Sequence, residues 1–432
     1  MITDMGANRF VTQSLNDPRI LRILSAVLNA VDPYKAVKKY LPKLDGDIYG
    51  LAVGKAAISM VTALADSYPL SGALAISKHT SSASSADDHP PLSANTMSFP
   101  LLLSGHPIPD ARSVHAGERA LEFVSSLKEE DTLVCLISGG GSALMTAPLI
   151  PLDELQTLTA SLLASGATVN EINTIRRHLD RVKGGGLARA TKAKIVSLIL
   201  SDVIGNSLEA IASGPTAPDP TTMEDTRLTF EKFSFNQPTI LQFSNSLVET
   251  LKPNDPIFSR VQNIIIGDNK LAAVAALEQA QREGFDSEIL TNELQGEARD
   301  VGVMLAKKLR DEISKRPRPF CLIAGGETTV TIKGNGKGGR NQELALAVVN
   351  ELRGLENVML IALATDGDDG PTDAAGAVVT GESAERANRL GLSEADSLSR
   401  NDAFPFFESL GDLIRTHPTG TNVNDLIFLF AL

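Results

Sequence analysis

The chain has 432 residues, of which 43% are hydrophobic and 21% are charged. At roughly 100–200 residues per domain, this length predicts two or three domains, and the composition excludes a fibrous, mostly disordered or multi-span membrane protein. The net charge of −12 argues against a general nucleic-acid partner, because such proteins neutralise phosphates with an excess of basic residues. It leaves room for a local basic cleft that binds small anions.

The first 45 residues predict helix, because Ile20, Leu24, Val27 and Val31 recur at helical spacing. Six short apolar runs follow, each ending in small or polar residues. They occupy residues 48–57, 132–143, 193–205, 262–273, 319–330 and 357–370. Runs without alternation are typical of strands that are buried on both faces of a parallel sheet.

Helical stretches such as residues 271–284 separate these runs. The sequence therefore predicts an α/β fold class, with two α/β domains whose mostly parallel sheets are flanked by helices. In such sheets, ligands bind beyond the carboxyl ends of the strands. We place the domain boundary near residue 240, because residues 214–245 are Pro-rich at first and lack clear periodicity, so that the domains are residues 1–240 and 241–432. The Ser- and Pro-rich residues 78–99 predict a surface loop.

The two cysteines, Cys135 and Cys321, lie in apolar runs, which predicts buried free thiols. No apolar run approaches the roughly 20 residues of a membrane helix, and residues 1–10 lack the pattern of a secretory signal. These features predict a cytoplasmic protein with no membrane partner. They leave open whether the chain forms a homo-oligomer.

A glycine-rich motif follows the second apolar run. Gly139, Gly140, Gly141 and Ser142 lie between a predicted strand and a predicted helix, where backbone N–H groups converge on anions. The motif matches neither a Walker A loop nor a nucleophile elbow. Lys55 likewise ends a strand, where its charge suits phosphate or carboxylate; a solvated surface lysine is the alternative.

Residues 173–189 form the densest basic stretch of the chain and include Arg177 and Lys183. The adjoining Gly184-Gly185-Gly186 favours an anion-binding site, and a solvated helix face is the alternative.

Residues 334–340 (GNGKGGR) match the GxGxxG pattern, after a strand-like TTVTIK and before a predicted helix. This is the one feature that supports a nicotinamide-binding Rossmann unit. Lys337 and Arg340, beside Gly338 and Gly339, fit a polyphosphate better, because Arg pairs with phosphate oxygens in bidentate fashion.

Residues 366–373 (DGDDGPTD) carry four carboxylates at a predicted strand end. Asp366 could bind Mg²⁺ or accept a hydroxyl proton, and a capped turn is the alternative. Asp202 and Glu327, each at a strand end, are weaker metal candidates. The six histidines form no HxH or HxxxH pair, which argues against catalytic zinc, and His106 and His417 are interpreted as loop residues with local hydrogen bonds.

Taken together, these motifs resemble the glycerate 2-kinase family, whose C-terminal half is named MOFRL. The matching words occur in the family's order and span nearly the whole chain. They are VGKAA (53–57), SGHPIPD (104–110), LISGGGSAL (136–144), NTIRRHLDRVKGGGLA (173–188), SDVIGNSLEAIASGPTAPDPTT (201–222), AGGETTV (324–330), GKGGRNQE (336–343), TDGDDGPTDAAGA (365–377) and PTGTNVND (418–425).

The resemblance implies a kinase that uses ATP and Mg²⁺ to phosphorylate the 2-hydroxyl of D-glycerate, giving 2-phosphoglycerate and ADP. It implies a Rossmann-like N-terminal domain, a MOFRL-type C-terminal domain and an active site in the cleft between them. The functional lysine and arginine of the family fall on Lys55 and Arg340. Two departures concern Lys78-His79-Thr80, where the family has Tyr-Gly-His-like residues, and Asn206, where an acidic residue is common.

We therefore expect a small-molecule enzyme whose partners are D-glycerate and ATP. The expected catalytic residues are Lys55, Arg340 and Asp366, and the expected metal ligands are Asp202, Glu327 and Asp366. The expected nucleotide-binding residues are Gly139, Gly140, Gly141, Ser142, Arg177, Lys183, Lys337, Gly338 and Gly339. An NAD(P)H-dependent hydroxypyruvate reductase and a non-catalytic anion sensor are the alternatives.

Overall fold

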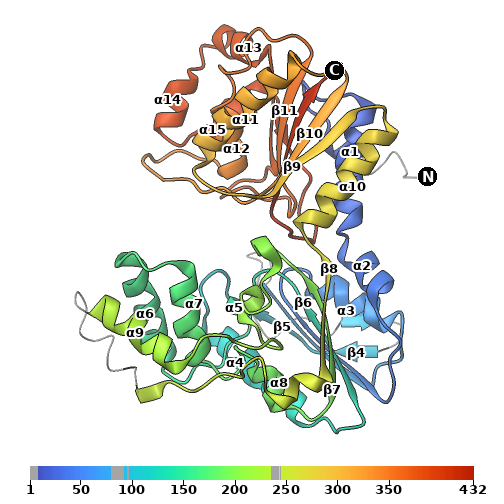
Figure 1. Cartoon of the computed structure of the whole chain (residues 1–432), viewed down its shortest axis with the longest axis vertical. Helices are drawn as coiled ribbons and strands as arrows, with labels where there is room; N and C mark the ends of the chain where they lie inside the picture. Colours follow the sequence, from blue (N-terminus) through green and yellow to red (C-terminus); the bar gives the residue numbers. More distant parts are fainter. Residues whose placement is uncertain (1–7, 79–91, 95–96, 235–242, 244) are drawn as a thin grey trace. The chain divides into compact units, whose positions relative to one another are not determined.

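A computed structural model describes residues 8–78, 92–94, 97–234, 243 and 245–432, and it divides the chain into two compact units (Figure 1). We call residues 33–266 the parallel-sheet unit, and residues 1–32 with 267–432 the mixed-sheet unit. The sequence placed the division near residue 240 and the N-terminus in the first domain. The structure differs because strand β8 still pairs with the first sheet, whereas the N-terminal helix packs on a helix after residue 267.

The parallel-sheet unit contains a six-stranded sheet in the order β5-β2-β1-β6-β7-β8. Its strands are β1 (Ile48–Val53), β2 (Gly72–Lys78), β5 (Leu101–Ser104), β6 (Thr132–Ile137), β7 (Lys194–Leu200) and β8 (Val261–Gly267). The first five strands pair in parallel, so their carboxyl ends meet at one edge of the sheet. The α/β prediction is confirmed for this unit.

Helices cover both faces of this sheet. Gly50 faces helix α3, whereas its neighbour Leu51 belongs to the core shared with helix α4, because successive residues of a strand point to opposite faces. The helices on the sheet are α2 (Pro33–Tyr40), α3 (Ala57–Ala65), α4 (Ala111–Ser125), α5 (Gly141–Leu144) and α8 (Gly186–Ala190). A hairpin of β3 (Leu92–Ala94) and β4 (Met97–Phe99) follows residues 79–91, which include His79 and lie outside the described part of the predicted loop.

Three further helices of this unit bury a core of their own beside the sheet. They are α6 (Leu152–Ala164), α7 (Val169–His178) and α9 (Met223–Ser234). Helix α7 begins at Thr168, whose hydroxyl accepts a hydrogen bond from Glu171 N while the Glu171 carboxylate accepts one from Thr168 N. Leu158 and Phe230 are among the residues packed in this core.

The mixed-sheet unit also contains six strands, in the order β13-β12-β11-β14-β10-β9. They are β9 (Asp286–Leu294), β10 (Phe320–Gly326), β11 (Val358–Ala364), β12 (Gly376–Thr380), β13 (Leu413–Ile414) and β14 (Asp425–Ala431). Among the described strands of this unit, β9 and β10 pair in parallel and the other pairs are antiparallel, so the expectation of a mostly parallel sheet is wrong for this unit. The last strand, β14, lies between β10 and β11 and runs antiparallel to both. All seven of its residues are buried, so its apolar sequence gives no indication of strand direction.

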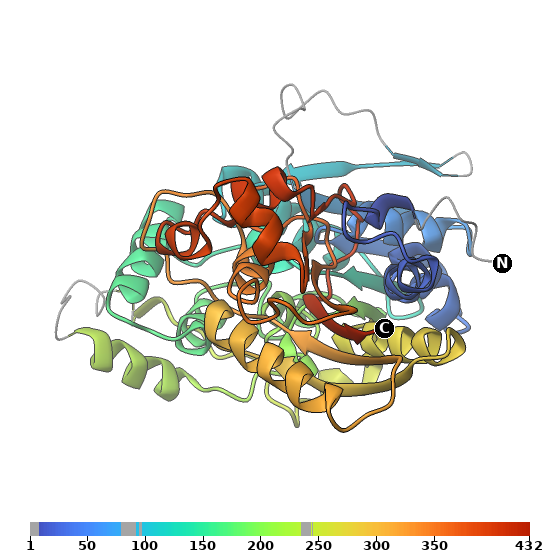
Figure 2. The same ribbon diagram turned by 90° about the horizontal axis from the view of Figure 1, so that it is seen from above.

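Helices again cover both faces of the mixed sheet. On one face α1 (Pro18–Ala30) lies along α10 (Asn269–Arg282), side by side in Figures 1 and 2, which confirms the predicted N-terminal helix. The other face carries α11 (Ala298–Ile313), α12 (Arg340–Leu346), α13 (Ser383–Arg389), α14 (Glu394–Ser399) and α15 (Ala403–Leu410). Every second residue of β11, such as Leu360 and Ala362, faces this second group.

Both cysteines are buried and free, as predicted, and burial raises the pKa of Cys135 to about 12. Of the helices that the structure describes, none combines the length and the apolar character needed to cross a membrane.

Replacing Leu360 by alanine should lower the free energy of unfolding by about 2–5 kcal/mol, because its side chain has 0% exposure and leaves a cavity. Leu390→Ala is the matched control, since Leu390 is 56% exposed in the same unit and should change the free energy by less than about 0.5 kcal/mol. Denaturant unfolding measures both, and equal losses would contradict the described core.

Candidate active site

Lys55 follows strand β1 at a point where β1 and β6 come close together. Gly54 has φ +123°, and a Cβ there would overlap the carbonyl of Ser138 at the end of β6. Lys55 N donates to Gly139 O at 3.0 Å, and Ala56 N donates to Ser138 Oγ at 3.0 Å. Only glycine fits this approach, and the half-buried Lys55 is fixed beside the glycine-rich motif.

The glycine-rich motif is enclosed by a second segment, residues 209–214. A Cβ on Gly141 would lie 2.9 Å from Ala212 Cβ, and Ser142 Oγ lies 2.8 Å from Ser213 Oγ. Ala212 and Ser213 have φ values of +50° and +60°, a conformation that costs non-glycine residues about 1–3 kcal/mol each. Such strain persists only where surrounding contacts over-determine it, and it is concentrated at functional sites.

Lys78 and His106 join this motif, although the sequence analysis did not select either as a site residue. The position of a Cβ on Gly140 is 3.0 Å from His106 Cδ2. Partial burial, together with the charges of Lys55 and Lys78, lowers the pKa of His106, so its imidazole is neutral at pH 7. Lys78 is the last residue of β2, and His106 lies two residues after the end of β5, so their positions after apolar runs are the signal that could have found them. We call Lys55, Lys78, His106 and residues 138–142 the Lys55 cluster.

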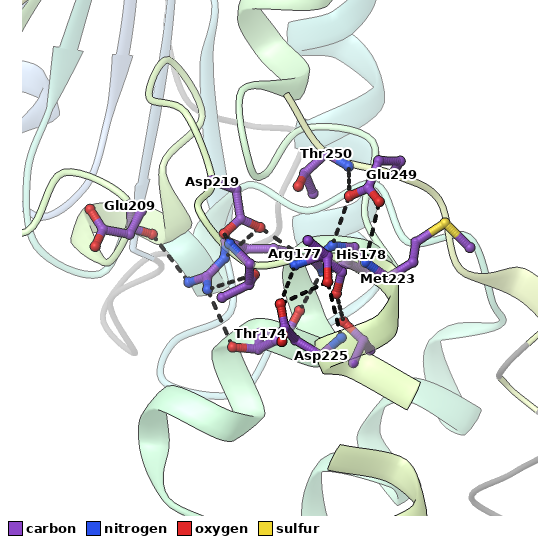
Figure 3. Close-up of polar contacts among 12 residues, drawn as sticks. Thr174, Arg177, His178, Glu209, Asp219, Met223, Asp225, Glu249 and Thr250 are labelled. Carbon is purple, nitrogen blue, oxygen red and sulfur yellow. Dashed lines mark hydrogen bonds and ion pairs between the residues drawn. The ribbon is translucent and has the colours of Figure 1, made fainter. Parts of the chain in front are cut away.

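Arg177 does not face a ligand site in this structure. Its side chain is 6% exposed, and Nε lies 2.9 Å from Asp219 Oδ2 in an ion pair (Figure 3). Its other nitrogens donate to the Glu209 carbonyl at 3.4 Å and to the hydroxyls of Thr174 and Thr221 at 3.3 Å each. All of these contacts are within the protein, and a nucleotide contact of Arg177 stays a prediction.

Lys183 is likewise buried, with a side-chain exposure of 1%. Its Nζ donates to Asp180 Oδ2 at 2.8 Å and to Thr146 Oγ1 at 3.2 Å. Burial lowers the pKa of Lys183, whereas the Lys183 ammonium holds the pKa of Asp180 below its usual value despite burial. Arg177 and Lys183 are thus buried and paired with carboxylates, which contradicts the solvated-face interpretation. Their nucleotide contacts stay predictions.

Arg340 occupies the corresponding edge of the mixed sheet. It begins helix α12, and its Nε donates to Asp425 Oδ2 at 2.5 Å, its Nη2 to Asp425 Oδ1 at 3.1 Å and its Nη1 to Glu327. Despite partial burial, these two carboxylates raise the pKa of Arg340. Three of its five N–H donors are used in this way, and the side chain remains 31% exposed.

Asp369 fixes the loop that carries Arg340. Its carboxylate accepts Asn341 N at 3.1 Å and Gln342 N at 2.8 Å, and a Cβ on Gly339 would overlap it. Burial and the nearby Asp425 charge raise the pKa of Asp369 to about 7, against the two backbone donors. The Asp369 carboxylate therefore caps the start of helix α12. Within the acidic loop, Asp366 Oδ1 accepts a hydrogen bond from Asp368 N at 3.2 Å, as a capped turn would have. We call Glu327, Arg340, Asp369 and Asp425 the Arg340 cluster; the sequence analysis selected neither Asp369 nor Asp425.

The loop before Arg340 is held by the helices α14 and α15 of the same unit. Lys337 is exposed; its Nζ lies 4.2 Å from the centre of the Phe404 ring, and its N donates to Asp402 Oδ1 at 2.9 Å. Gly338 O lies 2.3 Å from the position of a Cβ on Gly370, so this loop packs directly on the acidic loop. Residues 328–333 form no strand, so the strand-like prediction for TTVTIK is wrong. Residues 334–340 therefore lack the strand that precedes the glycine-rich turn of a dinucleotide site.

The expected metal ligands do not form a ready metal site. Glu327 bonds to Arg340, while Asp202 and Asp366 are half-buried at the ends of β7 and β11. Within the described residues, no group of three or more His, Cys, Asp or Glu side chains could hold a metal ion. Mg²⁺ in phosphate-transferring sites commonly uses one or two carboxylates with substrate phosphates and water, so a single half-buried carboxylate such as Asp366 has the chemistry of such a ligand.

Comparison with known proteins gives a coherent answer for the whole chain. Residues 19–245 match a family described as a domain of unknown function, DUF4147, and residues 320–425 match the MOFRL family. The chain is 41% identical over 420 residues to a D-glycerate 2-kinase from Thermotoga maritima, covering 94% of this chain and 96% of that one. The chain belongs to the glycerate kinase family.

Further relatives extend this result. A glycerate 2-kinase from Pyrococcus horikoshii is 38% identical over 94% of this chain and 95% of its own length. A chain from Agrobacterium vitis, described only as a candidate hydroxypyruvate reductase, is 35% identical over 98% and 96% of the two chains. The crystal structure of a glycerate kinase from Thermotoga maritima matches with a TM-score of 0.85 and 40% identity, covering 96% of this chain and 99% of that one. These comparisons confirm the family resemblance that the motifs indicated. They also confirm the fold class of two α/β domains and the enzyme class, which is that of a glycerate kinase.

The raised pKa of Asp369 predicts a pH-dependent loss of stability. Between about pH 4, where an unfolded aspartate ionises, and about pH 7, the folded chain keeps the proton that the unfolded chain releases. Rising pH therefore favours unfolding, and the stability of the wild type relative to Asp369→Asn should fall across this window. Denaturant unfolding at both ends of the window measures the difference, with Asp396→Asn on an exposed helix as the control. A difference that stays constant or grows would contradict the assignment.

Proposed function

We propose that this glycerate kinase transfers the γ-phosphate of ATP to the 2-hydroxyl of D-glycerate, giving 2-phosphoglycerate and ADP. The observation that carries the proposal is the 41% identity, over 94% of the chain, to a protein named D-glycerate 2-kinase. The basic Lys55 cluster and the Arg340 cluster support it, because phosphoryl transfer depends on positioning and on neutralising phosphate charge.

Lys55 binds an anionic group of a substrate. Its backbone is fixed by the bond to Gly139 O, while the side chain is a flexible point charge suited to phosphate or carboxylate. Residues 139–142 offer backbone N–H groups beside it, and Lys78 adds a second positive charge. A neutral His106 leaves the positive charge on the two lysines and offers hydrogen bonds.

Arg340 binds the transferring phosphoryl group or the glycerate carboxylate with the N–H donors that Glu327 and Asp425 leave over. Those two carboxylates hold the guanidinium plane in one orientation, so that little side-chain freedom is lost when a ligand binds. Lys337, Gly338 and Gly339 lie on the same loop and contribute to nucleotide binding. Asp369 orders this loop without touching the substrate.

Asp366 accepts the proton of the glycerate hydroxyl. The oxygen of that hydroxyl attacks the γ-phosphorus, the bond to the bridging oxygen of ADP breaks, and the hydroxyl proton passes to the carboxylate. Asp369 and Asp425 are 2% exposed, whereas Asp366 is half-buried near the end of β11. Its Oδ1 accepts a hydrogen bond from Asp368 N at 3.2 Å, which orients the carboxylate. Mg²⁺ enters as part of the MgATP substrate, with Asp366 or Asp202 as a protein ligand.

A hydroxypyruvate reductase is the second candidate, supported by the description of the Agrobacterium vitis relative. This chain has no strand directly before the glycine-rich turn at residues 334–339, and the dinucleotide-binding motif of a nicotinamide enzyme needs such a strand.

One assay separates these functions. The purified chain is incubated with D-glycerate, ATP and Mg²⁺, and separately with hydroxypyruvate and NAD(P)H. We expect glycerate-dependent ADP formation, and ³¹P and ¹³C NMR of the product should identify 2-phosphoglycerate. A 3-phosphoglycerate product, or NAD(P)H consumption without ADP formation, would contradict the proposal.

Lys55→Met should lower kcat/KM by about 100-fold or more, because it removes a charge that faces the substrate while keeping the length of the side chain. Lys194→Met is the matched control, since Lys194 is exposed at the amino end of β7 in the same sheet. Initial rates of ADP formation measure both variants. Equal activity in the two would remove Lys55 from the proposed site.

A further inference from the structure

A buried ion pair joins helix α7 to the segment after β7. Arg177 and Asp219 have side-chain exposures of 6% and 0%, and Figure 3 shows the guanidinium between Asp219 and the Glu209 carbonyl. Asp219 also accepts hydrogen bonds from the backbone N and the hydroxyl of Thr221, at 3.0 and 2.7 Å. Asp219 is therefore held by Thr221, whereas the contact of Arg177 Nε with Asp219 Oδ2 is an ion pair whose geometry does not make a hydrogen bond. The Arg177 guanidinium also donates to the Glu209 carbonyl at 3.4 Å, which links it to the Glu209 backbone.

Glu209 begins the strained segment that touches the glycine-rich motif. Ala212, Ser213 and Gly214 are three consecutive residues with positive φ, at +50°, +60° and +64°. Two of the three carbonyl groups accept hydrogen bonds from the triple glycine: Gly184 N donates to Ser213 O at 3.0 Å and Gly185 N to Gly214 O at 2.7 Å. The segment is thus anchored at its beginning by Arg177 and at its end by the triple glycine.

The same segment meets the motif through two contacts. The Ser213 hydroxyl lies 2.8 Å from the Ser142 hydroxyl, and Ala212 leaves no space for a side chain on Gly141. Arg176, the neighbour of Arg177, donates to the carbonyl of Ser142 at 3.5 Å. Two adjacent arginines of α7 therefore contact the motif, one directly and one through residues 209–214.

We propose that Arg177 is a positioning residue for nucleotide binding: through the Glu209 carbonyl it holds residues 209–214 against Gly141 and Ser142, and so sets the geometry of the loop that receives the ATP phosphates. The inference rests on the proposed function, because it takes this loop to bind ATP. Arg177, although it is buried, would thus affect activity without contacting the substrate. A strained segment relaxes when an anchor is removed, and a small displacement of a binding loop weakens binding.

The test uses a double variant, because Arg177→Met alone leaves Asp219 buried without its partner and endangers folding. Arg177→Met/Asp219→Asn removes both charges, keeps similar volumes and breaks the bond to Glu209 O. We expect a cooperative unfolding transition near that of the wild type, with a KM for ATP and a dissociation constant for ATP raised about tenfold and kcat changed much less. Arg181→Met, on a half-exposed arginine four residues along, is the control and should match the wild type.

Ser213→Ala provides the independent variant, since it removes only the bond to the Ser142 hydroxyl and leaves the ion pair intact. We expect it to raise the KM for ATP in the same direction. A folded double variant with wild-type affinity for ATP would overturn the inference. If the double variant does not fold, wild-type affinity for ATP in Ser213→Ala would overturn it.

Calorimetric titration of ATP into the wild type separates this inference from the proposed function. ATP binding without glycerate phosphorylation would refute only the proposed reaction, and the comparison of ATP affinities among the variants would still decide the role of Arg177.

Discussion

The candidate site depends on one close approach between two strand ends. Gly54 and Ser138 come so near that a side chain on Gly54 would overlap the Ser138 carbonyl, and the Lys55 amide then bonds to Gly139. Because the strands are parallel, the residues that follow β2 and β5 arrive at the same edge. Lys55, Lys78 and His106 thus gather without being near in sequence. Lys55 and Lys78 bring positive charge to this edge, although the chain as a whole carries −12. An acidic protein can therefore bind anions, provided that its basic side chains meet at one edge.

The mixed-sheet unit also gathers charged side chains at one end of its sheet, but through an antiparallel strand. Strand β14 runs antiparallel between β10 and β11, so its first residue, Asp425, lies level with the last residues of both neighbours, Gly326 and Ala364. This pairing brings Asp425 to Arg340 and Glu327 at one end of the sheet. The guanidinium is held by two carboxylates, and Asp369 fixes the following backbone from the next loop. The cluster is rigid before any ligand arrives, which reduces the entropy lost on binding.

The sequence predicted the strands and the glycine-rich motifs well, because buried apolar runs and strand-end glycines are local signals. All six apolar runs contain strands, as β1, β6, β7, β8, β10 and β11. It could not predict the direction of β14, since a strand buried on both faces has no alternating pattern. The basic stretch was harder to interpret, because Arg177 and Lys183 look like ligand-binding cations in sequence, whereas the structure pairs them with the buried carboxylates of Asp219 and Asp180. Asp219 lies 42 residues after Arg177 in the chain (219 − 177), so no local signal reveals this pair. Asp425 stood in a family motif, yet its pairing with Arg340 depends on sheet topology alone.

The proposed site requires that the glycine-rich loops at the two sheet edges receive the substrates. Hydrogen–deuterium exchange of the wild-type chain, measured by mass spectrometry with and without MgATP and D-glycerate, tests this requirement. We expect slower exchange in peptides covering residues 53–57, 138–146 and 336–342 when both substrates are present, because bound phosphate and carboxylate groups engage and cover these amides. Unchanged exchange in all three regions, with protection confined to other parts of the chain, would contradict it.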